Sequence, residues 1–128
     1  MSSLLKERVR DIIIEFLVSE GISWRKLVFF AGYGVNDIYD MEIYLETGKG
    51  FEGCSEDRLV NINKLLKTFS RINELLVINR KVLGWNTVTI VTGSNNKTKV
   101  DRDYTNEFKD PITYKMEWKK YYLKSEGS

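Results

Sequence analysis

The sequence predicts an α+β domain, an antiparallel sheet of four to five strands with helices packed on it, in the order α-β-β-(β)-α-β-β-α. Apolar residues recur at intervals of three and four in residues 3–20 and in a longer segment ending near residue 79, as they do along one face of a helix. Two pairs of short stretches, with alternating or β-branched residues and a turn between them, predict two hairpins. The 128 residues are expected to form a single domain, 1–128.

The first helix is predicted over residues 3–20 and ends before Gly21, a residue type that favours a helix C-terminus. Its apolar stripe consists of Leu5, Val9, Ile12, Ile13, Phe16 and Leu17. Charged residues occupy the opposite face, which is typical of a helix whose role is to pack against a core.

The first hairpin contains two different kinds of strand. Within residues 24–33, the run from Leu27 to Phe30 is apolar in both alternating sets, which predicts a strand covered on both faces. After a turn at residues 33–37, residues 38–47 alternate between an apolar set and an acidic one. We expect the apolar set to be buried, namely Tyr39, Met41, Ile43, Leu45 and Thr47, and the other to be solvated, namely Ile38, Asp40, Glu42, Tyr44 and Glu46. The glycine-rich residues 47–54 are expected to form a loop or a short third strand around Phe51.

Two further helices are predicted. Ser55 is the expected N-cap of the longest helix, which Gly84 ends. Asp110 and Pro111 are an N-cap and a first-turn proline, so they begin a terminal helix. The many aromatic residues of this terminal helix indicate that it docks on the domain, with the helices lying to one side of the sheet.

The second hairpin combines a β-branched strand, residues 87–92, with a returning strand, residues 97–104. Asp101 and Asp103 are two residues apart on the returning strand and therefore share a face. Adjacent carboxylates can share a cation or act as an acid–base pair. A carboxylate-dependent small enzyme is therefore one alternative, although solvent exposure of both residues is the simpler interpretation.

Negative charge is concentrated in residues 37–57, where seven carboxylates and one basic residue, Lys49, give a net charge of −6 in a chain whose total is +2. An acidic sheet face that also carries a tyrosine fits a basic partner surface. The longest helix is instead basic on its outer face. A nucleic-acid-binding or regulatory module is therefore a second alternative, with contacts at Arg58, Lys64, Lys67 and Arg71.

The chain contains no histidine and a single cysteine, Cys54. Most catalytic triads, zinc sites and acid–base catalysts near neutral pH use imidazole, and an intrachain disulfide needs two cysteines. We therefore expect a protein that is not an enzyme and has neither a cofactor nor a metal site. The sequence shows no secretion signal and no run of about 18 apolar residues, so a cytoplasmic location without membrane contact is expected.

Four segments carry a resemblance to a known family. They are Trp-Arg-Lys-Leu-Val-Phe-Phe at 24–30, Trp-Asn-Thr at 85–87, Lys-Val-Asp-Arg-Asp-Tyr at 99–104 and Trp-Lys-Lys-Tyr-Tyr-Leu at 118–123. In the order of these segments the sequence resembles the YezG-like immunity family of small cytoplasmic bacterial proteins. The resemblance implies a protein that binds and neutralises a cognate toxin, in many cases a nuclease, delivered by contact-dependent growth inhibition or a related secretion system.

A nuclease toxin needs a basic groove for its substrate, so the acidic sheet face is the expected contact surface. The expected toxin-binding residues are Asp40, Glu42, Tyr44 and Glu46, together with Asp101 and Asp103 if the two hairpins share a face. No direct contact with nucleic acid is implied, and the oligomeric state is left open.

Overall fold

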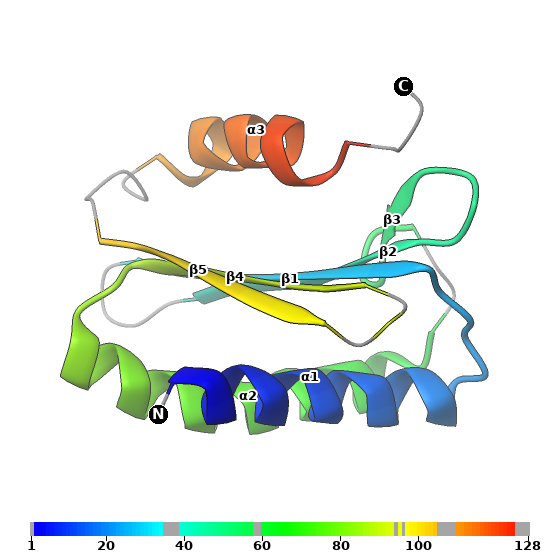
Figure 1. The fold of residues 1–128 in the computed structure, drawn as a ribbon, viewed down its shortest axis with the longest axis horizontal. Coiled ribbons are helices and arrows are strands. Elements are labelled where there is room, and N and C mark those ends of the chain that lie inside the picture. Colours follow the sequence, from blue (N-terminus) through cyan, green and yellow to red (C-terminus); the bar gives the residue numbers. More distant parts are fainter. Residues whose placement is uncertain are drawn as a thin grey trace.

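The computed structural model describes residues 2–34, 39–57, 60–93, 95, 97–104 and 110–124. The elements follow the predicted order, and the optional third strand is present (Figure 1). They are α1 (Ser2–Ser19), β1 (Lys26–Tyr33), β2 (Tyr39–Glu46), β3 (Phe51–Gly53), α2 (Ile62–Leu83), β4 (Thr87–Gly93), β5 (Thr98–Asp103) and α3 (Pro111–Tyr122). The five strands form one antiparallel sheet in the order β3-β2-β1-β4-β5. The α+β class and the antiparallel sheet are therefore confirmed.

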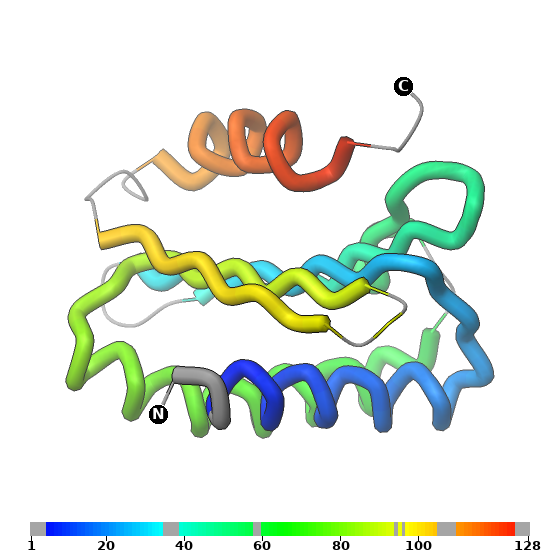
Figure 2. Tube along the Cα trace, in the orientation of Figure 1, coloured from blue at the N-terminus to red at the C-terminus, as the bar shows by residue number. Residues whose placement is uncertain are grey.

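The helices lie on both faces of the sheet. Helices α1 and α2 cover one face side by side, and α3 covers the opposite face (Figures 1 and 2). The expectation that the helices lie to one side is wrong. The physical reason is the central strand β1, which is buried on both faces from Leu27 to Tyr33 and therefore needs a cover on each.

The larger core lies between the sheet and the pair α1 and α2. Helix α1 contributes Val9, Ile13, Phe16 and Leu17, and α2 contributes Leu65, Phe69, Ile72 and Leu76. They pack on the sheet face formed by Leu27, Phe29, Ala31, Met41, Ile43, Leu45, Val88 and Ile90. The predicted apolar side of residues 38–47 is thus confirmed at its three central positions.

A smaller core lies between the sheet and α3. Val28 and Phe30 from β1 and Tyr44 from β2 meet Trp118, the only side chain of α3 that is buried. Half-buried Phe51, Val91, Tyr114, Tyr122 and Leu123 surround this cluster. The prediction that the terminal helix docks on the domain is therefore confirmed, and Trp118 is its anchor.

The longest helix, α2, ends as predicted and begins later than predicted. Gly84 adopts a left-handed conformation with φ of 80° and its backbone N–H donates to the carbonyl of Arg80. The N-cap is Asn61, whose side chain accepts from the backbone N–H of Lys64, and not Ser55. Ser55 does not begin the helix because residues 54–57 form a turn, in which the backbone N–H groups of Glu56 and Asp57 donate to the carbonyl of Gly53.

None of the helices in the described residues combines the length and the apolar composition needed to cross a bilayer.

Candidate binding groove between the sheet and the last helix

The strand register brings the six predicted toxin-binding residues to one face of the sheet. Glu42 lies opposite Phe30, Phe30 opposite Thr89, and Thr89 opposite Asp101, so these four residues form one row across β2, β1, β4 and β5. Neighbouring residues two positions away share this face because strand side chains alternate. The two hairpins therefore present the same face, which was the condition for including Asp101 and Asp103.

Helix α3 covers the middle of this face. Glu42 and Tyr44 are each only 2% exposed, so the expectation that they form a solvated surface is wrong. The Trp118 ring lies 5.3 Å from the Tyr44 ring and 4.9 Å from the Phe30 ring. A partner cannot reach Tyr44 while α3 is in place, and Glu42 is buried against Gly53 and Ser55.

Glu42 has an internal role in joining β2 to the turn after β3. Its carboxylate accepts hydrogen bonds from the backbone N–H of Ile43 at 2.9 Å and from the backbone N–H and the hydroxyl of Ser55. Burial raises the pKa of the Glu42 carboxyl, and the hydrogen bonds from Ser55 and Ile43 oppose part of that rise. Gly53 lies against this carboxylate, because a Cβ there would come within 2.9 Å of the Glu42 Oε2.

The raised pKa of Glu42 predicts a pH-dependent stability. Since this pKa in the folded protein lies above 4.5, the folded state binds the Glu42 proton more tightly than the unfolded chain does. Glu42 therefore lowers the free energy of unfolding as pH rises from 4.5 through its folded pKa. We expect the free energy of unfolding of Glu42→Gln to depend less on pH. Relative to the parent, the variant should therefore become more stable as pH rises. Urea unfolding at a series of pH values from 4.5 upward measures this, and equal slopes would contradict it.

The other carboxylates of residues 37–57 also have partners within the fold. Asp40 pairs with Lys115 of α3 at 3.1 Å, and Glu56 lies 3.9 Å from Lys119. Glu46 and Asp57 accept hydrogen bonds from the backbone N–H groups of Gly48 and Gly53, respectively. Asp37, which the sequence analysis included in this acidic stretch, lies outside the described residues. Much of the stretch thus supports β3 and α3.

Lys115 is a functional residue of the fold that sequence reasoning missed. Its ammonium lies 4.7 Å from the centre of the Phe30 ring and 5.5 Å from that of Tyr44, and it also pairs with Asp40. A cation above aromatic faces is attracted by their quadrupoles, more strongly when partly desolvated. The sequence feature that could have identified Lys115 is its position three residues before Trp118, on a helix already expected to dock.

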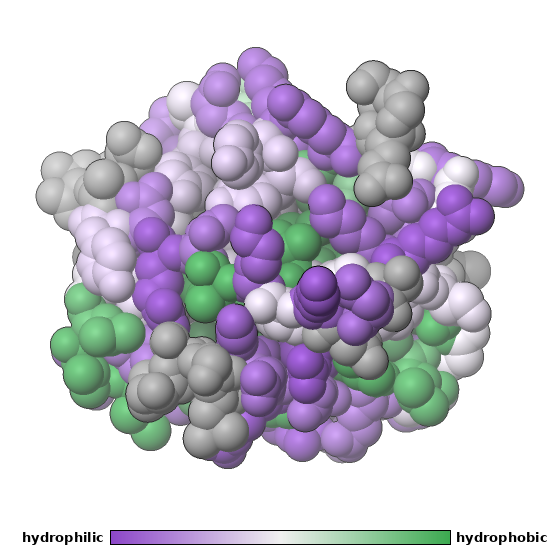
Figure 3. Space-filling view, in the orientation of Figure 1, coloured by the Kyte–Doolittle hydropathy of each residue, from purple (hydrophilic) through white to green (hydrophobic). Residues whose placement is uncertain are grey.

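A groove of about 600 Å³ remains open on the β5 side of α3. Its walls carry four carboxylates, those of Asp101, Asp103, Asp110 and Glu117. Its apolar lining is aromatic and consists of Tyr114, Trp118, Tyr121 and Tyr122. On this side of the molecule, side chains of intermediate hydropathy gather over α3 and strongly hydrophilic ones lie below them (Figure 3). Acidic and aromatic side chains therefore share one concave surface.

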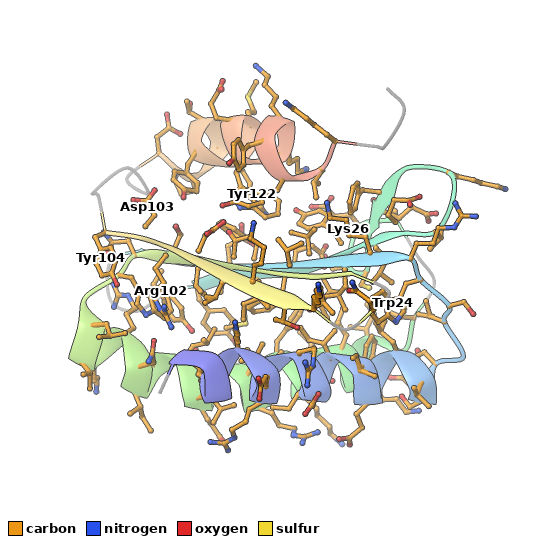
Figure 4. All side chains as sticks on the ribbon, viewed as in Figure 1. Trp24, Lys26, Arg102, Asp103, Tyr104 and Tyr122 are labelled. Atoms are coloured by element: carbon orange, nitrogen blue, oxygen red, sulfur yellow. The ribbon has the colours of Figure 1, made fainter. Side chains whose placement is uncertain are left out.

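Tyrosine hydroxyls hold the carboxylates at the groove floor. The hydroxyl of Tyr122 donates to Asp101 at 2.7 Å, and that of Tyr114 donates to Asp103 at 3.1 Å. Burial raises the pKa of Tyr122, and its hydrogen bond to Asp101 adds to the rise, so this hydroxyl stays a donor. Figure 4 shows Tyr122 directed from α3 toward the sheet and Asp103 on the α3 side of β5. Each aspartate keeps further lone pairs for a partner, since a carboxylate accepts several hydrogen bonds.

The start of α3 places the fourth carboxylate at the mouth of the groove. Asp110 caps the helix as predicted, accepting from the backbone N–H of Thr113 at 3.2 Å and from its hydroxyl at 2.8 Å. These hydrogen bonds lower the pKa of Asp110. The cap and Pro111 fix the first turn, and so fix the position of Tyr114 over Asp103.

No protein-family model matches the chain, and no curated protein matches it either.

The structure also places residues of the two alternative functions, a nucleic-acid-binding or regulatory module and a carboxylate-dependent enzyme. Lys64 pairs with Glu20 at 3.5 Å and Arg71 with Glu15 at 3.4 Å, so two of the proposed nucleic-acid contacts are engaged with α1. Arg58 lies outside the described residues. Within the described ranges, no group of three or more histidine, cysteine, aspartate or glutamate side chains is arranged to hold a metal ion.

Proposed function

We propose that this protein is a cytoplasmic immunity protein that binds and neutralises a cognate bacterial toxin through the groove between β5 and α3. The proposal rests on one observation: four carboxylates and four aromatic side chains line the same open groove. Acidic groups attract a basic partner and speed its encounter, and tyrosine and tryptophan supply the contact energy that charge alone does not.

The chemistry of the groove favours a basic protein segment over a nucleic acid. Phosphates would be repelled by Asp101, Asp103 and Glu117, whereas lysine and arginine side chains would be attracted. A nuclease toxin presents such a basic surface at its substrate groove, so a nuclease is the toxin class that the charge pattern supports. The resemblance of the four sequence segments to the YezG-like immunity family supports delivery by contact-dependent growth inhibition or a related secretion system.

The structure narrows the expected contact surface. Of the predicted residues, Asp101 and Asp103 line the groove, while Tyr44 lies under α3 and Glu42 is buried beside the turn after β3. Asp40 is paired with Lys115, and Glu46 stands at the far end of β2. The contacts that the sequence did not predict are on α3, at Glu117 and at Tyr121, which is 72% exposed.

The test is a double variant, Glu117→Lys with Tyr121→Ala, assayed against a bacterial nuclease toxin domain that the parent protein binds and neutralises. Both side chains are exposed, so the fold is expected to survive. Loss of an aromatic anchor and reversal of a charge should weaken binding by at least about 30-fold, the size of one hot spot. Calorimetry gives the affinity, and co-expression with the toxin gives protection.

The matched control is Glu74→Lys with Met116→Ala, which makes the same charge change on α2 and truncates an exposed residue on the other side of α3. It should bind and protect like the parent. Full protection by the groove variant, or an equal loss in the control, would refute the groove as the binding site.

A further inference from the structure

Strand β5 is an open edge of the sheet. Among the described strands, none pairs with its outer side, and neither α1 below it nor α3 above it crosses in front of it (Figure 1). An edge of this kind presents unpaired backbone N–H and C=O groups and is a template for another strand.

The pairing with β4 determines which groups face outward. The N–H of Gly93 donates to the carbonyl of Lys97, so odd-numbered residues of β5 are those hydrogen-bonded to β4. The outward N–H and C=O groups therefore belong to Thr98, Val100 and Arg102. A strand added at this edge must pair with these three residues.

The charges along this edge are complementary to those of a second copy of the strand that runs in the opposite direction. Counting every second residue from Lys97, the side chains are two lysines followed by two aspartates, at 97, 99, 101 and 103. They share the face that carries α3, because Asp101 and Asp103 both contact tyrosines of that helix. An antiparallel copy of the same segment would set each lysine opposite an aspartate.

We propose that the occupant of this edge is a second copy of the chain, with β5 pairing antiparallel to β5 about a two-fold axis at Val100. In this register Val100 lies opposite Val100, Lys99 opposite Asp101, and Lys97 opposite Asp103 of the second copy. The interface is isologous, so each pair of opposite charges occurs twice. The two five-stranded sheets become one continuous sheet.

Other registers are disfavoured by like charges. Centring the pair on residue 101 sets Asp101 against Asp101, and centring it on residue 99 sets Lys99 against Lys99. Directly opposed like charges destabilise a strand pair. Registers that pair an outward residue with an inward one lose the backbone hydrogen bonds altogether. The charge pattern thus selects Val100 as the centre.

The test is a charge swap measured by sedimentation equilibrium of the full chain. Lys99→Asp alone, or Asp101→Lys alone, sets like charges opposite each other twice and should weaken the dimer by about tenfold or more, because each unfavourable pair occurs twice. The double variant restores opposite charges and should return the dissociation constant to within about threefold of the parent value. Lys67→Asp on α2 is the matched control and should leave dimerisation unchanged.

Hydrogen exchange followed by NMR checks the register. The amide of Val100 should become protected as concentration rises, whereas that of Lys99, already bonded to β4, should be protected at every concentration. Circular dichroism establishes that each variant is folded. A parent chain that stays monomeric at millimolar concentration, or a folded double variant that fails to regain the dimer, would overturn the proposal. The test needs no toxin, so its outcome is independent of the proposed function.

Discussion

Replacing Trp118 with alanine is expected to lower the free energy of unfolding by about 3–5 kcal/mol, the usual loss when a buried tryptophan is truncated. Trp118 is 5% exposed, packs on Phe30 and Tyr44, and donates its indole N–H to the hydroxyl of Thr89 at 2.8 Å. No other side chain of α3 is buried, so its loss leaves the helix without an anchor. The groove is formed by α3 and should be lost with it.

Urea unfolding followed by circular dichroism measures the Trp118→Ala effect, and protection against the toxin measures its consequence. Tyr121→Ala is the matched control for stability, because the Tyr121 ring lies on the same helix and is largely exposed. It should change the free energy of unfolding by no more than about 0.5 kcal/mol. A similar small loss for Trp118→Ala would mean that α3 contributes little to the fold.

The sequence predicted the sheet well because its local signals agreed with its long-range packing. Residues 38–47 alternate, and the structure buries Met41, Ile43 and Leu45 as their spacing requires. The cover over the opposite face was also implied. Val28 and Phe30 are apolar and lie on the opposite sheet face from Leu27 and Phe29. The layer that covers Val28 and Phe30 must also lie over a strand paired with β1.

What the sequence could not supply was the identity of that cover. Three helices were available, and period and composition do not say which face a helix occupies. Once α3 is placed over β1, it extends to β2 and removes Tyr44 from solvent, while the turn after β3 buries Glu42. The candidate surface consequently moves from β2 to β5 and to α3 itself.

The long-range hydrogen bonds were equally out of reach of local patterns. Ser55 followed by two acidic residues is a favourable helix start, yet the backbone N–H groups of Glu56 and Asp57 donate to the carbonyl of Gly53 in a turn. The backbone N–H and the hydroxyl of Ser55 donate to a carboxylate 13 positions earlier, which holds this turn against β2. The helix begins instead at Asn61.

The strongest contrast between sequence and structure is expected from one charge reversal made at two sites of β2. Glu42 and Glu46 lie on the same face of the strand, and the sequence pattern treats them alike. The structure buries Glu42 against the turn after β3 with donors from Ser55, whereas Glu46 is half-buried at the strand end beside the exposed Gly48. The two substitutions should therefore have very different effects on stability.

Glu42→Lys places an ammonium among backbone N–H donors in a buried site, and we expect it to lower the free energy of unfolding by about 3–5 kcal/mol, as for an uncompensated buried charge. Glu46→Lys should stay within about 1 kcal/mol of the parent, because its side chain reaches water. Urea unfolding of both variants at neutral pH decides the matter. Loss of toxin protection in Glu42→Lys would then reflect unfolding, and only Glu46→Lys would report on docking at this end of the sheet. Equal stabilities would contradict the burial of Glu42 and return the contact surface to β2.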